Sequence, residues 1–205
     1  MLVKLGLGKA LRRFCSMRLR AMALAGLAAA GLLASGPAPA GATSAHDFSF
    51  ISIEGEPLPL ERYAGKAVLL VNTASRCGFT PQYAGLQELW ERYRGRGLVV
   101  LAVPSNDFLN QEPGSSQEIK EFCEAHFGID FPMTEKQQVI GRDAHPLYRW
   151  IAAELGREGK PRWNFHKFLI GPDGAVVTGW NSRTRPLADD VLAEIERAIP
   201  QAATN

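Results

Sequence analysis

Residues 67–81 read AVLLVNTASRCGFTP, and this stretch decides the fold. Residues 67–71 form a continuous apolar run of strand length, which is typical of a strand buried on both faces of a sheet. Thr80 and Pro81 suit the N-cap and the first position of a helix. A lone cysteine, Cys77, lies between the predicted strand and the predicted helix start. The stretch therefore predicts a strand, a thiol-bearing loop and a helix.

The flanking segments extend this alternation. Residues 98–103 (LVVLAV) read as a second buried strand, so residues 67–103 form a β-α-β unit. Ser115 and Glu118 form a capping box for a helix that ends near Gly128. Further predicted elements are a hairpin that starts with residues 48–53, a helix over 146–155, a hairpin over 168–177 and a helix over 188–199. This order predicts an α/β, thioredoxin-like sandwich: a central mixed sheet flanked by helices, with an N-terminal β-hairpin.

Residues 1–40 have the pattern of a signal peptide. They hold six cations and no acid, followed by the apolar run AMALAGLAAAGLLA over residues 21–34. This run has the length of a signal-peptide apolar region, and the A-x-A pattern of residues 38–40 follows it. An uncleaved membrane anchor is the alternative. We expect a single domain over residues 41–205 that is exported, in a bacterium to the periplasm.

The charge and the cysteine content of residues 41–205 argue against several classes of function. Seventeen cations face twenty-one acids, a net charge of −4, so no basic excess indicates nucleic-acid binding. Two cysteines remain, Cys77 and Cys123, and neither is part of a C-x-x-C motif. The four histidines are scattered and match no zinc-binding pattern. We therefore expect neither a metal nor another cofactor.

Cys77 is placed where a thiol can react. Sites in open α/β sheets form beyond the carboxyl ends of the strands, and a following helix N-terminus favours a thiolate. A buried, inert cysteine fits the same position, so position alone does not decide. Trp163 and Asn164, in a loop before the 168–170 strand, could donate hydrogen bonds to a thiolate and to a substrate oxygen. A merely packed tryptophan is the alternative there.

Five segments together resemble the glutathione peroxidase family: VNTASRCGFTPQY, LAVPSNDFLNQEPGS, EIKEFCEAHFGIDFPM, HPLY and WNFHKFLIGPDG. They occur in the family's order and cover nearly all of residues 46–198. The resemblance implies a thioredoxin-like fold and a peroxidase of hydrogen peroxide and organic hydroperoxides. It also implies that Cys77 is the peroxidatic residue, supported by Trp163 and Asn164.

One position departs from the family. Where the family reads Asn-Gln-Phe, this chain reads Asn106-Asp107-Phe108. We expect Asp107 to occupy the place of the supporting glutamine, although an ionised carboxylate cannot donate a hydrogen bond. Asp107 could be protonated, turn away, or accept a proton through water, and Asn106 could supply the amide instead. If the carboxylate is inhibitory, Asp107→Gln raises the rate of peroxide attack.

Cys123 has two interpretations. By itself it is a core thiol on a helix; the resemblance implies the resolving cysteine of thioredoxin-dependent members, which forms a disulfide with Cys77. The expected reductant is a thioredoxin-like protein or glutathione. The short segment 149–162 resembles the monomeric branch of the family. Two other functions stay open: a thioredoxin-fold thiol-disulfide oxidoreductase, which the missing C-x-x-C disfavours, and a redox-relay sensor.

Overall fold

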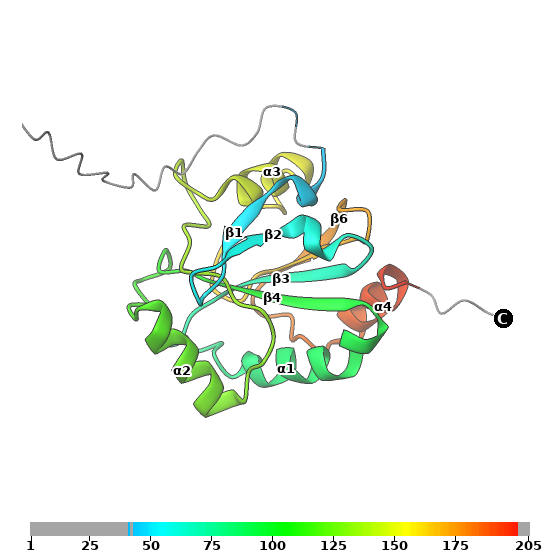
Figure 1. Cartoon of the computed structure of the whole chain (residues 1–205). Helices are drawn as coiled ribbons and strands as arrows, with labels where there is room; N and C mark the ends of the chain where they lie inside the picture. Colours follow the sequence, from blue (N-terminus) through cyan, green and yellow to red (C-terminus); the bar gives the residue numbers. More distant parts are fainter. Residues whose placement is uncertain (1–40, 42, 201–205) are drawn as a thin grey trace, which may run out of the picture. The chain divides into compact units, whose positions relative to one another are not determined.

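The computed structural model describes residue 41 and residues 43–200, and the signal peptide expected over residues 1–40 lies outside this part. The core of the fold is a four-stranded sheet in the order β4-β3-β5-β6 (Figure 1). Its strands are β3 (Ala67–Thr73), β4 (Leu98–Pro104), β5 (Lys167–Ile170) and β6 (Val176–Trp180). β3 pairs in parallel with β4 and antiparallel with β5. The predicted mixed sheet is confirmed.

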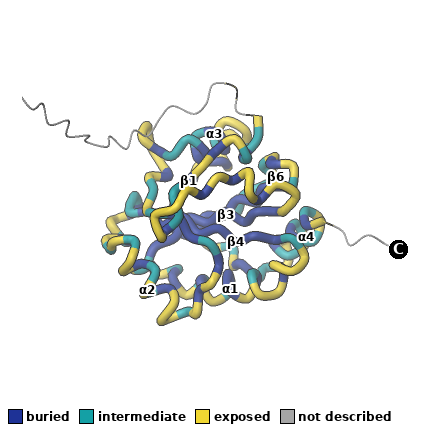
Figure 2. The backbone as a smooth tube through the Cα atoms, in the orientation of Figure 1, coloured by how far each residue is buried: buried dark blue, intermediate teal, exposed yellow. Residues whose placement is uncertain are grey.

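Strands β3 and β4 are buried along their whole length (Figure 2). Their register aligns Ala67 with Leu98 and Thr73 with Pro104. A parallel pair of this kind must be covered on both faces, which is why both strands read as continuous apolar runs instead of alternating.

Helices cover both faces of the sheet (Figure 1). The helices α1 (Gln82–Tyr93), α2 (Ser116–Phe127) and α4 (Asp189–Ala198) share one apolar cluster with Leu69 and Val71 of β3. Helix α3 (Pro146–Glu154) and the antiparallel hairpin β1 (Ser49–Ile51)–β2 (Pro57–Pro59) share another with Val68 and Leu70. Successive β3 side chains thus serve opposite layers. Within the described residues, every helix is too short or too polar to cross a bilayer.

Local capping rules account for the ends of α2 but not for the start of α1. Ser115 and Glu118 form the predicted capping box of α2, and Gly128 closes this helix in the left-handed region at φ 62°. The prediction that Thr80 caps α1 is wrong. The hydroxyl of Thr80 donates to the Ala74 carbonyl and accepts from the Cys77 N–H. It therefore closes the loop over residues 74–80 that carries Cys77, which we call the thiol loop.

His145 joins the β1–β2 hairpin to α3. The His145 Nδ1 accepts from the Leu147 N–H at 3.3 Å, so Nε2 carries the proton and donates to the Ser49 carbonyl at 3.1 Å. The imidazole also stacks on Phe50, with ring centroids 4.0 Å apart. Burial lowers the pKa of His145 to about 4. The neutral ring is therefore the form that the fold requires.

This contact predicts an acid-sensitive fold. Because the folded-state pKa of His145 lies below its ordinary value of 6.5, the unfolded chain binds the extra proton first. The free energy of unfolding should therefore fall as the pH drops from about 6.5 to 4. We expect His145→Asn, which keeps a capping side chain but cannot titrate, to make this part of the profile less steep in urea titrations. The buried His166, whose pKa is also lowered to about 4, mainly by burial, supplies the remaining slope. An equally steep profile in the variant would contradict the assignment.

Candidate functional site

Three loops converge at one edge of the sheet. β3 and β4 are parallel, so their carboxyl ends lie together, and the antiparallel β5 begins beside the end of β3. The loops there hold Cys77, Gln111 and the pair Trp163-Asn164. The mixed pairing thus brings segments distant in sequence to one place, where sites of open α/β sheets form.

The thiol of Cys77 lies in a hydrogen-bonded turn just before α1. The Cys77 N–H donates to Thr80 Oγ1 at 3.0 Å, and its carbonyl accepts from the Thr80 N–H at 3.0 Å. The Phe79 N–H points at the Cys77 sulfur at 3.4 Å. Only 7% of Cys77 is exposed. A backbone N–H aimed at sulfur near a helix start can stabilise negative charge that develops on the sulfur during a reaction.

Asn164 bonds to Gln111, not to Asp107. The Asn164 Nδ2 donates to Gln111 Oε1 at 2.9 Å, and Asn164 is fully buried. The Gln111 carbonyl accepts from the Arg76 N–H at 3.0 Å, next to Cys77 in the chain. Because Gln111 Oε1 is the acceptor in this bond, the side-chain NH₂ of the half-buried Gln111 can donate to a further group. Gln111 therefore links the thiol loop with the Trp-Asn loop.

Unusual backbone conformations border these contacts. Among the described residues other than glycine, positive φ occurs at Leu109 (55°), Asn110 (53°) and Phe165 (64°). Two of them precede Gln111 and the third follows Asn164. Such conformations are sparsely populated and cluster at functional sites, where the surrounding structure maintains them. Here they set the direction of the two bonded amides.

Asp107 turns away from the thiol. Its Oδ2 accepts from the N–H groups of Val139, at 2.6 Å, and Ile140, at 3.1 Å. Of the possibilities that the sequence left open, the structure has the one in which the carboxylate faces elsewhere. The assignment of Asp107 to the place of the family's glutamine is corrected: Gln111, four residues later, supplies the amide. The sequence contained a signal for Gln111, because residues 111–113 read QEP and so place a glutamine in the same loop.

Trp163 is held at the site by its backbone and by its ring. The side-chain amide of Asn72, in β3, donates to the Trp163 carbonyl at 3.1 Å. The Asn72 carbonyl accepts from the Phe165 N–H at 2.6 Å. The half-buried indole packs on Phe108, with ring centroids 5.7 Å apart, and against the apolar cluster that contains Cys77. The structure thus brings Trp163 and Asn164 to the end of β3, as the sequence predicts.

Cys123 is a free, fully buried thiol in α2. It belongs to the same apolar cluster as Cys77. Burial is the main cause that raises the pKa of Cys123 to about 11. A thiol in this state is a poor nucleophile. The described conformation is therefore a reduced one, and Cys123 must leave its packed position before it can react readily.

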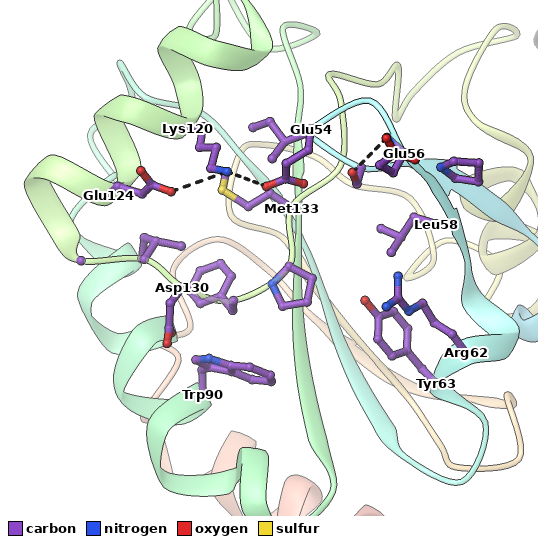
Figure 3. Close-up of a pocket in the computed structure, with 17 residues that line it drawn as sticks. Glu54, Glu56, Leu58, Arg62, Tyr63, Trp90, Lys120, Glu124, Asp130 and Met133 are labelled. Atoms are coloured by element: carbon purple, nitrogen blue, oxygen red, sulfur yellow. Dashed lines mark hydrogen bonds and ion pairs between the residues drawn. The ribbon is translucent and has the colours of Figure 1, made fainter.

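Helix α2 is fastened to the hairpin one turn before Cys123. Lys120 Nζ lies 2.8 Å from a carboxylate oxygen of Glu54 and 3.8 Å from one of Glu124. Figure 3 shows both ion pairs at one side of a pocket of about 800 Å³ whose wall includes Trp90 and Met133. The pocket contains neither cysteine. Exposed ion pairs of this kind contribute only about 0.2–1 kcal/mol, so they restrain α2 weakly.

Two buried ionisable side chains hold the site loops through hydrogen bonds. Glu112 accepts from Ser75 Oγ at 3.1 Å, and burial raises the pKa of Glu112. Lys167 Nζ donates to Gln82 Oε1 and to the Phe165 carbonyl, both at 2.7 Å, and burial lowers the pKa of Lys167 to about 7. Across the described residues, histidine, cysteine and carboxylate side chains form no group of three suited to a metal ion.

The comparisons with known proteins agree with this geometry. Residues 45–152 match the family model described as glutathione peroxidase. The chain belongs to the glutathione peroxidase family. It is 44% identical to hydroperoxy fatty acid reductase gpx1 of Synechocystis, over 75% of this chain and 95% of that protein. It is 42% identical to glutathione peroxidase-like peroxiredoxin GPX5 of Chlamydomonas reinhardtii, over 75% and 95%. The chain is therefore a glutathione peroxidase-like peroxidase.

Solved structures agree on the fold. The crystal structure of Trgpx in apo form is 38% identical, with a TM-score of 0.63, over 78% of this chain and 97% of that one. A thioredoxin family protein from Chlorobium tepidum, at 17% identity and a TM-score of 0.55, covers 75% and 93%. At that identity the second match concerns the fold alone. The family is built on the thioredoxin fold that the sequence predicts.

The contacts of Asp107 and Gln111 predict different effects when each side chain is removed. Loss of Asp107 should affect stability, and loss of Gln111 should affect the rate of reaction with peroxide. Asp107→Ala should lower the free energy of unfolding by about 1–3 kcal/mol, because two backbone N–H groups lose a charged acceptor. Gln111→Ala should instead slow the reaction of Cys77 with peroxide by about a hundred- to a thousandfold, the scale of one lost hydrogen-bond donor at a reacting centre. Stopped-flow fluorescence and urea titrations of both variants measure the two effects.

The unaltered chain and the milder variant Asp107→Asn, which keeps an acceptor oxygen, are the matched controls. A faster reaction in Asp107→Gln, as expected if the carboxylate inhibits the thiol, would contradict the present assignment. So would a normal rate of peroxide attack in Gln111→Ala.

Proposed function

We propose that Cys77 is the peroxidatic residue of a thiol peroxidase that reduces hydrogen peroxide and organic hydroperoxides. The observation that supports this most is the placement of a thiol under the Phe79 N–H, in a loop bonded to Gln111 and through it to Asn164. A thiolate needs donors around it, and the departing oxygen needs a proton. This arrangement offers polar hydrogens for both purposes.

The proposed reaction begins with attack of the Cys77 thiolate on one peroxide oxygen. A sulfur–oxygen bond forms as the oxygen–oxygen bond breaks, and the sulfur is oxidised to a sulfenic acid. The other oxygen leaves with the bond's electron pair and takes up a proton, giving water or an alcohol. Donors from Gln111, Asn164 and the Trp163 indole would stabilise the negative charge on that oxygen.

Cys123 completes the proposed cycle as the resolving cysteine. Its sulfur would displace hydroxide from the Cys77 sulfenic acid, and with one proton the products are a disulfide and water. Relatives named peroxiredoxin-like in Chlamydomonas reinhardtii and Schizosaccharomyces pombe support a thiol reductant. We propose a thioredoxin-like dithiol, which would reduce the disulfide and itself be oxidised; glutathione is the alternative.

The resolving step requires local opening of α2. Cys123 is fully buried, and the Lys120–Glu54 ion pair ties its helix to the hairpin. Because only the opened helix presents a reactive thiol, disulfide formation should be slower than peroxide attack. Sulfenic acid would then be detectable before the disulfide.

This mechanism predicts the products of peroxide treatment. The unaltered chain should form one intramolecular disulfide between Cys77 and Cys123, visible by mass spectrometry of unreduced peptides. Cys123→Ser should stop at the sulfenic acid and lose turnover with thioredoxin, while Cys77→Ser should form neither product. Glu54→Gln, which removes one restraint on α2, should speed disulfide formation by about two- to fivefold. Full thioredoxin-dependent turnover by Cys123→Ser would exclude the resolving role.

Export and a monomeric state are further parts of the proposal. The basic and then apolar pattern of residues 1–40 supports export. We expect the full chain, produced in a bacterial host, to appear in the periplasm with a mature N-terminus near residue 41 and the mass of one chain in solution. Intact-mass measurement and light scattering test this; a retained leader in the membrane fraction would indicate an anchor.

A further inference from the structure

A small cavity lies between the thiol loop and α2, and the steps described above do not use it. It has a volume of about 180 Å³. Ser75 and Arg76 of the thiol loop line one part of it, and Ile119 and Phe122 of α2 line another. Ile119 lies one helical turn before Cys123, so the two side chains share a face of the helix. The cavity, which we call the inter-cysteine cavity, thus lies between the segments that carry the two cysteines.

Glu112 lines this cavity and is buried, with only 1% of the residue exposed. Its carboxylate accepts from Ser75 Oγ at 3.1 Å. Its backbone is fixed as well, since its N–H donates to Asn106 Oδ1 at 2.8 Å and its carbonyl accepts from Lys136 Nζ at 3.1 Å. These three partners all lie outside α2. Opening of the helix would therefore leave the carboxylate of Glu112 beside the thiol loop.

The surroundings of Glu112 make its carboxylate a stronger base than an exposed one. Burial is the main cause that raises its pKa, and the hydrogen bond from Ser75 and the charges of Lys136 and Arg76 offset only part of this effect. Among the described residues, the carboxylate has no ion-pair partner. An anion in such surroundings takes up a proton more readily than it does in water.

A second carboxylate on the cavity wall is already engaged. Glu118 is exposed, and its Oε2 accepts from the N–H of Ser115 at 2.7 Å and from the Ser115 hydroxyl at 2.9 Å. These bonds lower the pKa of Glu118. Of the two carboxylates at the cavity, Glu112 is therefore the better proton acceptor, and Glu118 offers a matched comparison.

Cys123 needs a proton acceptor before it can attack. Its thiol, with a pKa of about 11, keeps its proton near neutral pH; burial is the main cause, and the charges of Glu112 and Glu124 add to it. Tyr83, another titratable group near Cys123, has a pKa that burial raises well above its ordinary value, so it stays protonated and cannot accept. Transfer of the thiol proton to Glu112 would also remove one of the charges that oppose the thiolate.

We propose that Glu112 takes the proton from the Cys123 thiol and returns it to the oxygen that leaves the Cys77 sulfenic acid. This assignment rests on the resolving role proposed for Cys123 and adds an acid–base group to that step. Ser75, which holds the carboxylate, lies two positions before Cys77, so the same carboxyl group is near both the arriving thiol and the departing oxygen.

Atoms and electrons balance in this step. The Cys123 sulfur is oxidised as it forms a bond to the Cys77 sulfur, which is reduced as its bond to oxygen breaks. The oxygen leaves as hydroxide and takes the proton from Glu112, which gives water. Glu112 ends in the form in which it began, and the products are one disulfide and one water molecule.

The test measures the two steps separately. The reduced chain is mixed with one equivalent of hydrogen peroxide, and sulfenic acid and disulfide are counted by mass spectrometry after rapid quenching. Glu112→Gln, which has a similar size but cannot take up the proton, should slow disulfide formation by about a hundredfold, the scale of one lost acid–base group, and by more than it slows peroxide attack. Glu118→Gln, which removes the other carboxylate of the cavity, is the matched control and should not slow disulfide formation.

The pH profile provides a measurement that a merely structural role would not change. Opening of α2 is a pre-equilibrium in this scheme, so proton transfer contributes to the observed rate. In the unaltered chain, disulfide formation should become faster with rising pH as Glu112 loses its proton, and Glu112→Gln should lack this rise. Ser75→Ala removes a bond that lowers the pKa of Glu112, so it should move the rise to higher pH. This variant keeps the carboxylate and decides the question even if Glu112→Gln does not fold.

Chemical rescue is the third measurement. Glu112→Ala enlarges the cavity, so added formate should restore part of the rate of disulfide formation, whereas Glu112→Gln fills the space and should not respond. An unchanged pH profile in Glu112→Gln or in Ser75→Ala, equal slowing in Glu118→Gln, or equal slowing of peroxide attack would each overturn the proposal. An unaltered chain that forms no disulfide would instead overturn the resolving role of Cys123 on which the proposal rests.

Discussion

The position of β3 between a parallel and an antiparallel neighbour is the constraint on which the site depends. The parallel partner β4 delivers its following loop to the carboxyl end of β3, and the antiparallel β5 starts at that same end. Cys77, Gln111 and Asn164 are thereby gathered from segments up to 87 positions apart. A sheet with β5 parallel would place Asn164 at the opposite edge. The directions of the strands therefore determine which side chains can meet at the site.

The two cysteines are both buried, but their surroundings differ. Cys77 lies in a loop whose N–H groups are turned toward sulfur and oxygen acceptors, while Cys123 is packed in a helix that faces the apolar core. The low polarity around Cys123 keeps its thiol protonated and raises its pKa to about 11. The fold thus places one thiol beside backbone hydrogen-bond donors and packs the other in the apolar core.

Most of the secondary structure could be predicted because its signals are local. The capping box of Ser115 and Glu118 and the fully apolar runs of β3 and β4 involve neighbours in sequence, and all are confirmed. Thr80 shows where this approach ends. Its type suits a helix cap, yet its hydroxyl bonds to Ala74 and Cys77, since the thiol loop needs the same donor and acceptor.

The sequence by itself determined the layered α/β fold, the family and the candidate residues Cys77, Trp163 and Asn164, because periodicity and short motifs record them directly. Only the tertiary structure decided between Asp107 and Gln111. Two successive residues with positive φ, Leu109 and Asn110, reverse the loop between them, so the amide reaches Asn164 while the carboxylate faces Val139. The groove between the start of α1 and residues 183–188 likewise exists only once these segments are packed together. Side-chain direction and the meeting of distant segments are products of packing, and no local pattern encodes them.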